Sequence, residues 1–321
     1  MTWKCPHGVQ PRLVFLENGV GEYHNTATLG SEVITIKWKI VKKGFVKWEC
    51  RISGQPFSAV YRHNPDGSIT GGMGTFKKIK SPKEAPSKSV EIANPIVEKA
   101  IRKQIKKPTG ELTEANLEKV TELRLADTQF TKAGLKEVAK LKQLTTLSLN
   151  RTKITDTGLK EVAKLQKLTH LYLVSTKITD AGLKEVAKLQ KLTHLSLAGT
   201  KITDAGLKDI AKLKNLTSLY LGGTKITAAG LKDIAKLQQL TSLDLEDSKI
   251  TDAGLKDIAK LQKLESLNLS WTKITNAGLK DTAKMQQLTR LSLNYTGITD
   301  AGAAELKKAM PKCKIEHSYW E

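Results

Sequence analysis

A segment of 24 residues recurs along most of the chain, and this repeat restricts the possible folds more than any other feature. Successive units begin at Val120, Leu144, Leu168, Leu192, Leu216, Leu240, Leu264 and Leu288, and a ninth, truncated unit begins at Lys312. No insertion interrupts the register. A fixed period of this length predicts a stack of similar units, because no single unit can bury its apolar face alone.

Each unit contains a strand pattern followed by a helix pattern. In LTHLSL, Leu195 and Leu197 alternate with polar residues, which predicts a short strand with one buried face. In AGLKDIAKL, Leu207 and Ile210 follow a helical spacing behind a Thr-Asp capping pair. Strands pack about 4.8 Å apart and helices about 8–10 Å apart, so the stack curves with its strands inside. The prediction is an α/β fold, a right-handed horseshoe with a parallel β-sheet inside and helices outside.

The consensus LTxLxLxxTKITDAGLKxxAKLxx resembles the leucine-rich repeat, with Thr176 and Thr200 standing where the family usually carries Asn or Cys. The resemblance is to bacterial leucine-rich repeat proteins with units similar to the ribonuclease-inhibitor and F-box types. It implies a horseshoe fold and a role in binding. It also implies that the repeated threonine hydroxyls bond neighbouring backbone groups, as the family's Asn does.

Residues 1–80 follow a different pattern and predict a separate domain. Their β-branched and aromatic segments are separated by turn signals, and they lie at 13–23, 32–41, 45–52, 57–70 and 74–80. This spacing predicts five or six antiparallel strands in a small meander or partial barrel. The segment resembles the lipocalin-like β-modules that precede leucine-rich repeats in some bacterial proteins.

Between these patterns the sequence predicts a linker and a cap. Residues 81–95 are rich in Pro, Ser and Lys, which is typical of a linker. Residues 96–119 predict a helical N-terminal cap, similar to the caps of bacterial leucine-rich repeat domains. The eight repeats then occupy 120–311, and 312–321 form a C-terminal cap strand.

The sequence does not contain the motifs of common enzyme classes. GxSxG, HExxH, GxxxxGK[ST] and a strand-following GxGxxG are all missing. Cys5, Cys50 and Cys313 are an odd number without CxxC spacing, which predicts ordinary reduced cysteines. We therefore expect neither catalytic activity nor a cofactor.

The net charge of +21 arises from 53 Lys and Arg against 32 Asp and Glu, and would by default indicate nucleic acid as a partner. However, the lysines recur at fixed helix and loop positions, alternate with carboxylates and are accompanied by few arginines or aromatics. This pattern predicts a solvated convex surface and argues against nucleic-acid binding as the main function.

The chain carries neither a long apolar run nor a signal-like start. We therefore expect no membrane span and a location in the cytoplasm, or secretion if a further segment precedes the chain. We also expect a monomer.

Four positions of each unit vary while the remainder is copied. These are the third, fifth, seventh and eighth, which should project from the concave sheet or its rim. The residues expected to contact a partner are His170, Tyr172, His194, Tyr220, Asp244, Glu246, Asp247, Asn268, Trp271, Arg290 and Tyr295. Clustered aromatic residues are typical of interfaces, and the acidic group indicates a neutral or basic polypeptide. Neutral drift among duplicated repeats is the alternative explanation.

His170 and His194 stand at the third position of consecutive units, which places them about 5 Å apart on adjacent strands. Because a zinc site would want a third ligand, we expect a solvated pair rather than a metal site.

The predicted function is a non-catalytic scaffold that holds a protein or peptide on the concave face. One alternative is a substrate-recognition subunit of an F-box-like ubiquitin ligase system, or a host-directed effector. Another is small-ligand binding by the N-terminal β-domain.

Overall fold

The computed structural model divides the chain into two units, Met1–Ser87 and Lys88–Glu321. The structure describes residues 88–318 throughout, and in the first unit it describes the backbone of six strands between residues 23 and 76. The strand predicted at 13–23 lies outside the described residues except for Tyr23, as do residues 81–87 of the predicted linker and the last three residues of the chain.

The six described strands of the first unit form one antiparallel sheet in chain order. They are β1 (Tyr23–Leu29), β2 (Glu32–Lys42), β3 (Phe45–Ile52), β4 (Gln55–His63), β5 (Ile69–Gly71) and β6 (Gly74–Phe76). Trp38 pairs with Trp48 across β2 and β3, and the register shifts between Ile40 and Lys42. The sequence does not predict β1, because its residues YHNTATL lack the apolar alternation of a half-buried strand.

The second unit contains nine parallel strands in one open sheet, ordered as in the chain. They are β7 (Glu122–Arg124), β8 (Thr146–Ser148), β9 (His170–Tyr172), β10 (His194–Ser196), β11 (Ser218–Tyr220), β12 (Ser242–Asp244), β13 (Ser266–Asn268), β14 (Arg290–Ser292) and β15 (Lys314–Glu316). Each residue pairs with the one 24 positions further along the chain, as Leu195 does with Leu219. The repeat length therefore also sets the register between neighbouring strands of the sheet.

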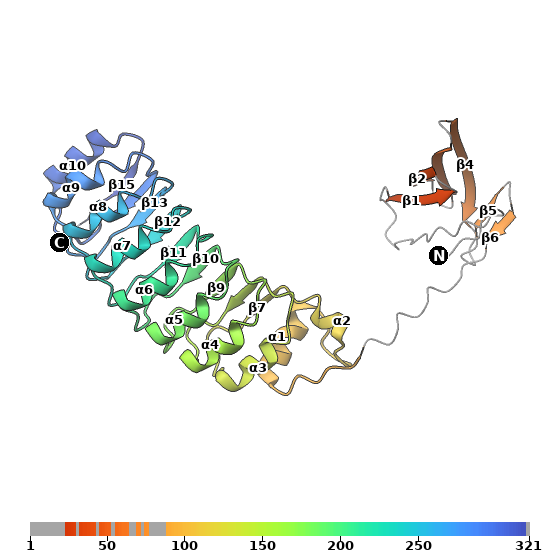
Figure 1. Ribbon diagram of the computed structural model, residues 1–321, viewed down its shortest axis with the longest axis horizontal. Helices are drawn as coiled ribbons and strands as arrows, with labels where there is room; N and C mark the ends of the chain where they lie inside the picture. Colours follow the sequence, from red (N-terminus) through yellow and green to blue (C-terminus); the bar gives the residue numbers. More distant parts are fainter. Residues whose placement is uncertain are drawn as a thin grey trace. The chain divides into compact units, whose positions relative to one another are not determined.

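One helical segment follows each of the first eight strands. These helices are α3 (Leu135–Val138), α4 (Asp156–Val162), α5 (Asp180–Val186), α6 (Asp204–Ile210), α7 (Leu231–Ile234), α8 (Leu255–Ile258), α9 (Leu279–Thr282) and α10 (Asp300–Ala309). Short 3-10 turns precede four of them, namely η1 (Lys132–Gly134), η2 (Ala228–Gly230), η3 (Asp252–Gly254) and η4 (Asn276–Gly278). Within this unit the strands line the inner side of a curved row and the helices form its outer side (Figure 1). The second unit thus has the α/β solenoid architecture that the repeat predicts.

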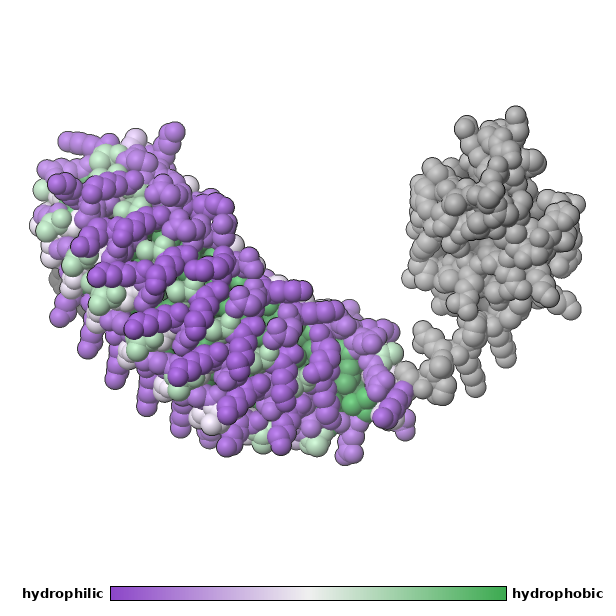
Figure 2. Space-filling model, viewed as in Figure 1, coloured by the Kyte–Doolittle hydropathy of each residue, from purple (hydrophilic) through white to green (hydrophobic). Residues whose placement is uncertain are grey.

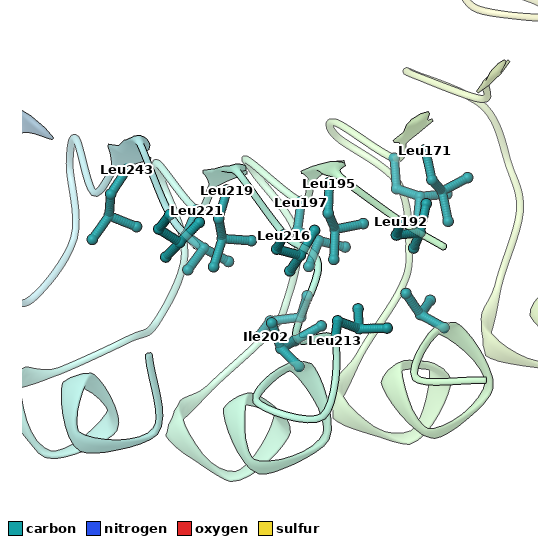
Figure 3. Packing of buried hydrophobic residues seen from close by; sticks show 14 of the residues in the cluster. Leu171, Leu192, Leu195, Leu197, Ile202, Leu213, Leu216, Leu219, Leu221 and Leu243 are labelled. Atoms are coloured by element: carbon teal, nitrogen blue, oxygen red, sulfur yellow. The ribbon is translucent and has the colours of Figure 1, made fainter. Parts of the chain in front are cut away.

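A ladder of aliphatic side chains fills the space between the strands and the helices. Leu195 and Leu219 point from their strands toward the helical layer, where Ile202 and Leu213 meet them (Figure 3). All four have no exposed surface. Because burying such a side chain stabilises a fold by about 1.5–3 kcal/mol, this ladder supplies most of the driving force for stacking.

The repeated threonines divide into two hydrogen-bonded rows. Thr200 Oγ1 donates to the Leu197 carbonyl of its own unit at 2.5 Å, and Thr176 does the same to Leu173 at 2.7 Å. The threonine at the second position instead bonds unit to unit, since Thr193 Oγ1 donates to the Thr169 carbonyl at 3.1 Å. The first row therefore stabilises the turn after each strand, and the second connects neighbouring units.

The aspartate that begins most helices also connects neighbouring units. Asp180 accepts hydrogen bonds from Thr203 N at 2.9 Å and from Thr203 Oγ1 at 2.6 Å, and Asp156, Asp204 and Asp252 bind the next unit in the same way. A Cβ atom on Gly206 would lie 2.4 Å from Asp180 Oδ1, so only glycine leaves room for this carboxylate. The sequence predicts the Thr-Asp pair as a helix cap and gives no sign of this second role.

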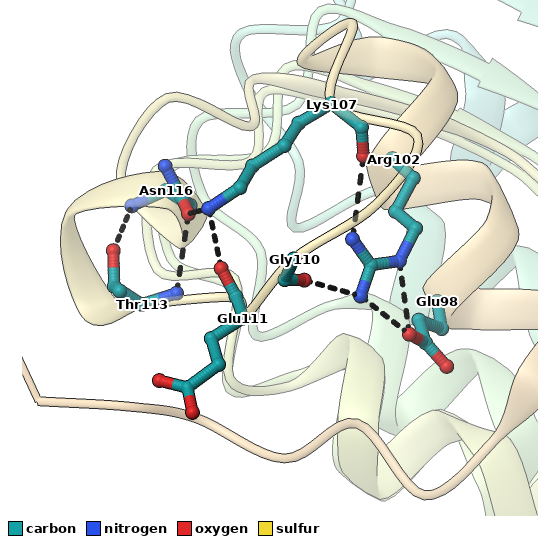
Figure 4. Close-up of polar contacts among 7 residues, drawn as sticks. All are labelled: Glu98, Arg102, Lys107, Gly110, Glu111, Thr113 and Asn116. Atoms are coloured by element: carbon teal, nitrogen blue, oxygen red, sulfur yellow. Dashed lines mark hydrogen bonds and ion pairs between the residues drawn. The ribbon is translucent and has the colours of Figure 1, made fainter.

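The first end of the apolar ladder is covered by α1 (Pro95–Gln104) and α2 (Glu114–Leu117). Arg102 holds the intervening loop by donating to Glu98, to the Lys107 carbonyl at 3.3 Å and to the Gly110 carbonyl at 2.9 Å (Figure 4). Thr113 and Asn116 form a reciprocal capping box at the start of α2. Polar contacts therefore fix a cap whose inner face is apolar.

Residues 88–94, which the sequence assigns to the linker, pack against this cap. Val90 N donates to the Leu112 carbonyl at 2.8 Å, Ser89 pairs with Thr113, and Ile92 is buried. The composition of this segment resembles a linker, yet the apolar residues in SVEIAN follow the alternation of a strand. The second unit accordingly begins at Lys88.

The fifth repeat lacks the aspartate contact between units, because Ala228 occupies that position. Thr251 has no side-chain partner at the corresponding place within the described residues, although Gly254 keeps the required space. We expect Ala228→Asp to raise the free energy of unfolding by about 1–2 kcal/mol, since two hydrogen bonds are added at about 1 kcal/mol each. Asp180→Ala should lower it by a similar amount. Urea denaturation of both variants tests this, and a neutral or destabilising Ala228→Asp would contradict it.

Candidate functional site

The inner face of the sheet carries the third and fifth residues of each unit, because they alternate with the buried leucine between them. The register aligns them into two rows across the nine strands. The third-position row includes His170, His194 and Arg290, and the fifth-position row includes Tyr172, Tyr220, Asp244 and Asn268. The predicted residues at these positions therefore share one surface.

His170 and His194 lie face to face on β9 and β10. Their ring centroids are 4.1 Å apart and the planes differ by 13°, closer than the 5 Å strand spacing suggests. Burial and the neighbouring His170 both hold the pKa of His194 below its ordinary value of 6.5. Because the two imidazole rings are nearly parallel, their nitrogen lone pairs point in the same direction. The rings would have to rotate away from each other before a nitrogen of each could bind one metal ion. Among the described residues, no group of three or more His, Cys, Asp and Glu side chains is placed to hold a metal ion.

Two tyrosines extend this surface along the fifth-position row. Tyr172 lies with its ring centroid 6.4 Å from that of His170, and only Ser196 separates it from Tyr220 in the row. Burial raises the pKa of Tyr172, and the nearby Tyr220 adds to that effect. Tyr172 is therefore protonated at neutral pH and presents a ring and a neutral hydroxyl.

An acidic group adjoins the tyrosines on β12 and β13. Glu246 N donates to Asp244 Oδ1 at 2.9 Å, and Asn268 Nδ2 donates to Glu246 Oε2 at 3.0 Å. Burial raises the pKa of Asp244, partly offset by the hydrogen bond from the Glu246 amide. Exposed Asp247 follows on the rim, and the three carboxylates occupy one unit. They give this part of the inner face an acidic character.

Trp271 and Tyr295 form an aromatic pair on the rim of the sheet. Their ring centroids are 4.5 Å apart, and Trp271 is the one large hydrophobic side chain among the described residues that is strongly exposed, at 42%. Both residues have a left-handed backbone, with φ of 60° and 56°. Gly199 and Gly223 occupy the same position elsewhere, where they adopt this conformation without the cost of about 1–2 kcal/mol that a side chain adds. Asp127, Arg151, Ser175 and Asp247 adopt the same conformation at this position, so the left-handed turn is common to all eight units.

The structure thus brings ten of the eleven predicted residues into three adjoining groups, and Arg290 lies apart from them. Arg290 is exposed on β14, and its backbone lies opposite that of Lys314 on β15. The predicted residues do not include Glu122 and Arg124 on β7, whose charges affect the pKa of Tyr172. Both stand at variable positions, so variability alone identifies them, whereas a preference for clustered aromatic residues does not.

The helical face differs from the inner face. Exposed lysines two residues beyond the helix ends pair with carboxylates three residues earlier, as Lys188 does with Glu185 at 2.8 Å and Lys212 with Asp209 at 2.6 Å. Figure 2 shows hydrophilic residues in parallel rows across this part of the second unit. Exposed pairs of this kind contribute at most about 1 kcal/mol each, so these rows mainly keep the surface solvated.

The histidine pair predicts a pH dependence of stability. Since the pKa of His194 is lowered in the fold, the unfolded chain binds more protons as the pH falls through 6.5, and stability decreases there. His194→Gln removes this linkage, so its unfolding midpoint in urea should change less than that of the wild type between pH 7.5 and pH 5. Parallel pH profiles for the two proteins would contradict the prediction.

Comparisons with known proteins agree with this architecture. Internalin C2 of Listeria monocytogenes is 24% identical, with a TM-score of 0.57 over 72% of this chain and 100% of that one, a likeness of fold. A leucine-rich repeat protein of Leptospira interrogans is 28% identical, with a TM-score of 0.50 over 63% of this chain and half of that one. A search of curated proteins found no match.

No helix in the described part of the chain combines the length and apolar character needed to span a membrane. The family model of the leucine-rich repeat region matches residues 112–304, which is more than half of the 321 residues. The matched segment begins in the cap and extends into the last helix, so it includes eight of the nine strands of the second unit. The chain belongs to the leucine-rich repeat family.

Proposed function

We propose that the second unit is a protein-interaction scaffold that holds a polypeptide on its inner face. The observation that carries this proposal is the contrast between the two faces. Aromatic, imidazole and carboxylate side chains gather on β9–β13 and the adjoining rim, whereas repetitive lysine–carboxylate pairs cover the helices.

The repeat architecture suits this role because it holds the binding side chains in place before a partner arrives. His194, Tyr220 and Asp244 stand on three successive strands whose leucines are fully buried. A stiff sheet loses little conformational entropy on binding. Tyrosine and tryptophan add large contact areas at a small entropic cost, so they are the expected anchors.

The charge of the inner face favours a neutral or basic polypeptide. Asp244, Glu246 and Asp247 would repel the phosphates of a nucleic acid at this surface. Exposed lysines lie on the opposite, helical face, where many are paired with carboxylates. A protein or peptide partner on the inner face is therefore proposed, with the chain acting as a monomer and without catalysis.

Several finer expectations from the sequence stay predictions. They are the ribonuclease-inhibitor or F-box type of the repeats, the roles in ubiquitin ligation or as a host-directed effector, and the cytoplasmic location. The lipocalin-like character and small-ligand binding of residues 1–80, and the division into 81–95, 96–119, 120–311 and 312–321, are also predictions.

Single substitutions on the two faces test the proposal. We expect Tyr220→Ala and Asp244→Ala each to weaken binding of a partner captured from the native cell by about 30-fold, as for an interface anchor of about 2 kcal/mol. Lys208→Ala on α6 is the matched control and should bind as the wild type does. Affinities would be measured by calorimetry on the purified partner. Equal affinity for the two inner-face variants and the control would refute the assigned face.

A further inference from the structure

The hydrogen bonds around the stacked histidines determine which ring nitrogen carries the proton. Thr169 Oγ1 lies 3.1 Å from the Thr145 carbonyl and 2.8 Å from His170 Nδ1. In the next unit, Thr193 Oγ1 lies 3.1 Å from the Thr169 carbonyl and 2.9 Å from His194 Nδ1. Each threonine hydroxyl thus stands between a carbonyl oxygen and an imidazole nitrogen.

The hydroxyl proton is already used by the carbonyl. Thr217 and Thr241 make the same 3.1 Å bond to the preceding unit, although serine rather than histidine follows each of them. A carbonyl oxygen only accepts, and a hydroxyl has one proton to donate. With the hydroxyl proton given to the carbonyl as in those units, Nδ1 is the donor in the remaining contact. We infer that both neutral imidazoles carry their proton on Nδ1 and a lone pair on Nε2.

The two Nε2 atoms are available to a partner. Neither makes a hydrogen bond to any residue between 88 and 318. The neighbouring residues in their row are Thr146 on β8 and Ser218 on β11, which do not ionise near neutral pH. Stacking at 4.1 Å places the two acceptors side by side. The pair is thus an acceptor surface at neutral pH.

Resting on the proposed function, we propose that His170 and His194 form a paired hydrogen-bond acceptor that selects a lysine or arginine side chain of the bound polypeptide and releases it on protonation. Complementary charge supports this choice of partner. The Asp244 carboxylate on β12 lies two strands beyond His194, about 10 Å away, and Glu246 and Asp247 follow it in sequence, so a short basic segment can reach both groups.

Protonation reverses the chemistry of this surface. A proton added at Nε2 turns an acceptor into a donor and adds a positive charge that repels a cation. Because the rings are in contact, a positive charge on one of them disfavours a positive charge on the other. The other ionisable groups nearby are Tyr172 and Tyr220 in the adjoining row, and Glu122 with Arg124 on β7. Burial raises the pKa of Tyr172, so this residue stays protonated, and the charges on β7 are opposite in sign.

Nitrogen-resolved NMR of the full chain with labelled histidine tests the tautomer. We expect both rings to carry the Nδ1 proton at pH 7.5, and Thr193→Val to shift His194 toward the Nε2-protonated form while His170 keeps its tautomer. Nε2 protonation of both rings in the wild type would overturn the assignment. So would a His194 tautomer that Thr193→Val leaves unchanged.

Fluorescence anisotropy with a ten-residue oligo-arginine peptide at constant salt tests the selection. The wild type should bind about fivefold more weakly at pH 5.5 than at pH 7.5, the effect of roughly one added charge at close range in water. A His170→Gln/His194→Gln double variant keeps acceptor oxygens but does not titrate, so it should bind at both pH values with a smaller change.

Other outcomes separate this proposal from the scaffold function. An identical pH dependence in the wild type and the double variant would overturn the release mechanism. Failure of the wild type to bind the peptide at pH 7.5 would overturn the selection of a basic side chain. Neither result bears on the inner-face affinity measurements with a native partner, which test the scaffold function separately.

Discussion

The lateral contact between identical units is the constraint on which the second unit depends. A unit of 24 residues buries its leucines only when the next unit lies beside it in register, and Leu195 and Leu219 show how completely that burial is achieved. The Asp180 carboxylate, fitted against Gly206 and bound to Thr203, adds a polar connection that tolerates no lateral shift. Buried side chains and glycines therefore have to be copied from unit to unit.

This constraint also locates the site. Positions that the stack needs cannot vary, so specificity is confined to residues that point away from it. The sheet then brings side chains from different units together, as with the His170 and His194 rings, which are 24 residues apart in sequence. At the rim, the left-handed turn that presents Trp271 occurs at the same position of every unit, so the scaffold sets the backbone there and only the side chain differs.

Periodicity predicts the parts of the fold that one unit determines by itself. The strand, the helix, the buried leucines and the alignment of His170 with His194 all follow from it. Features that depend on how two segments meet do not follow, such as the second role of Asp180 and the packing of Ile92 on the cap. Each of these needs the lateral distance between segments, which a one-dimensional pattern does not contain.

The claim that binding occurs on the inner face can be tested by site-specific photocrosslinking. A photoreactive phenylalanine analogue would replace Tyr220 on β11 in one protein and Lys208 on α6 in another, and each would be irradiated with the same purified native partner. We expect a covalent adduct from position 220 that Asp244→Ala diminishes, and little adduct from position 208. An adduct formed equally well from position 208, or from that position alone, would contradict it.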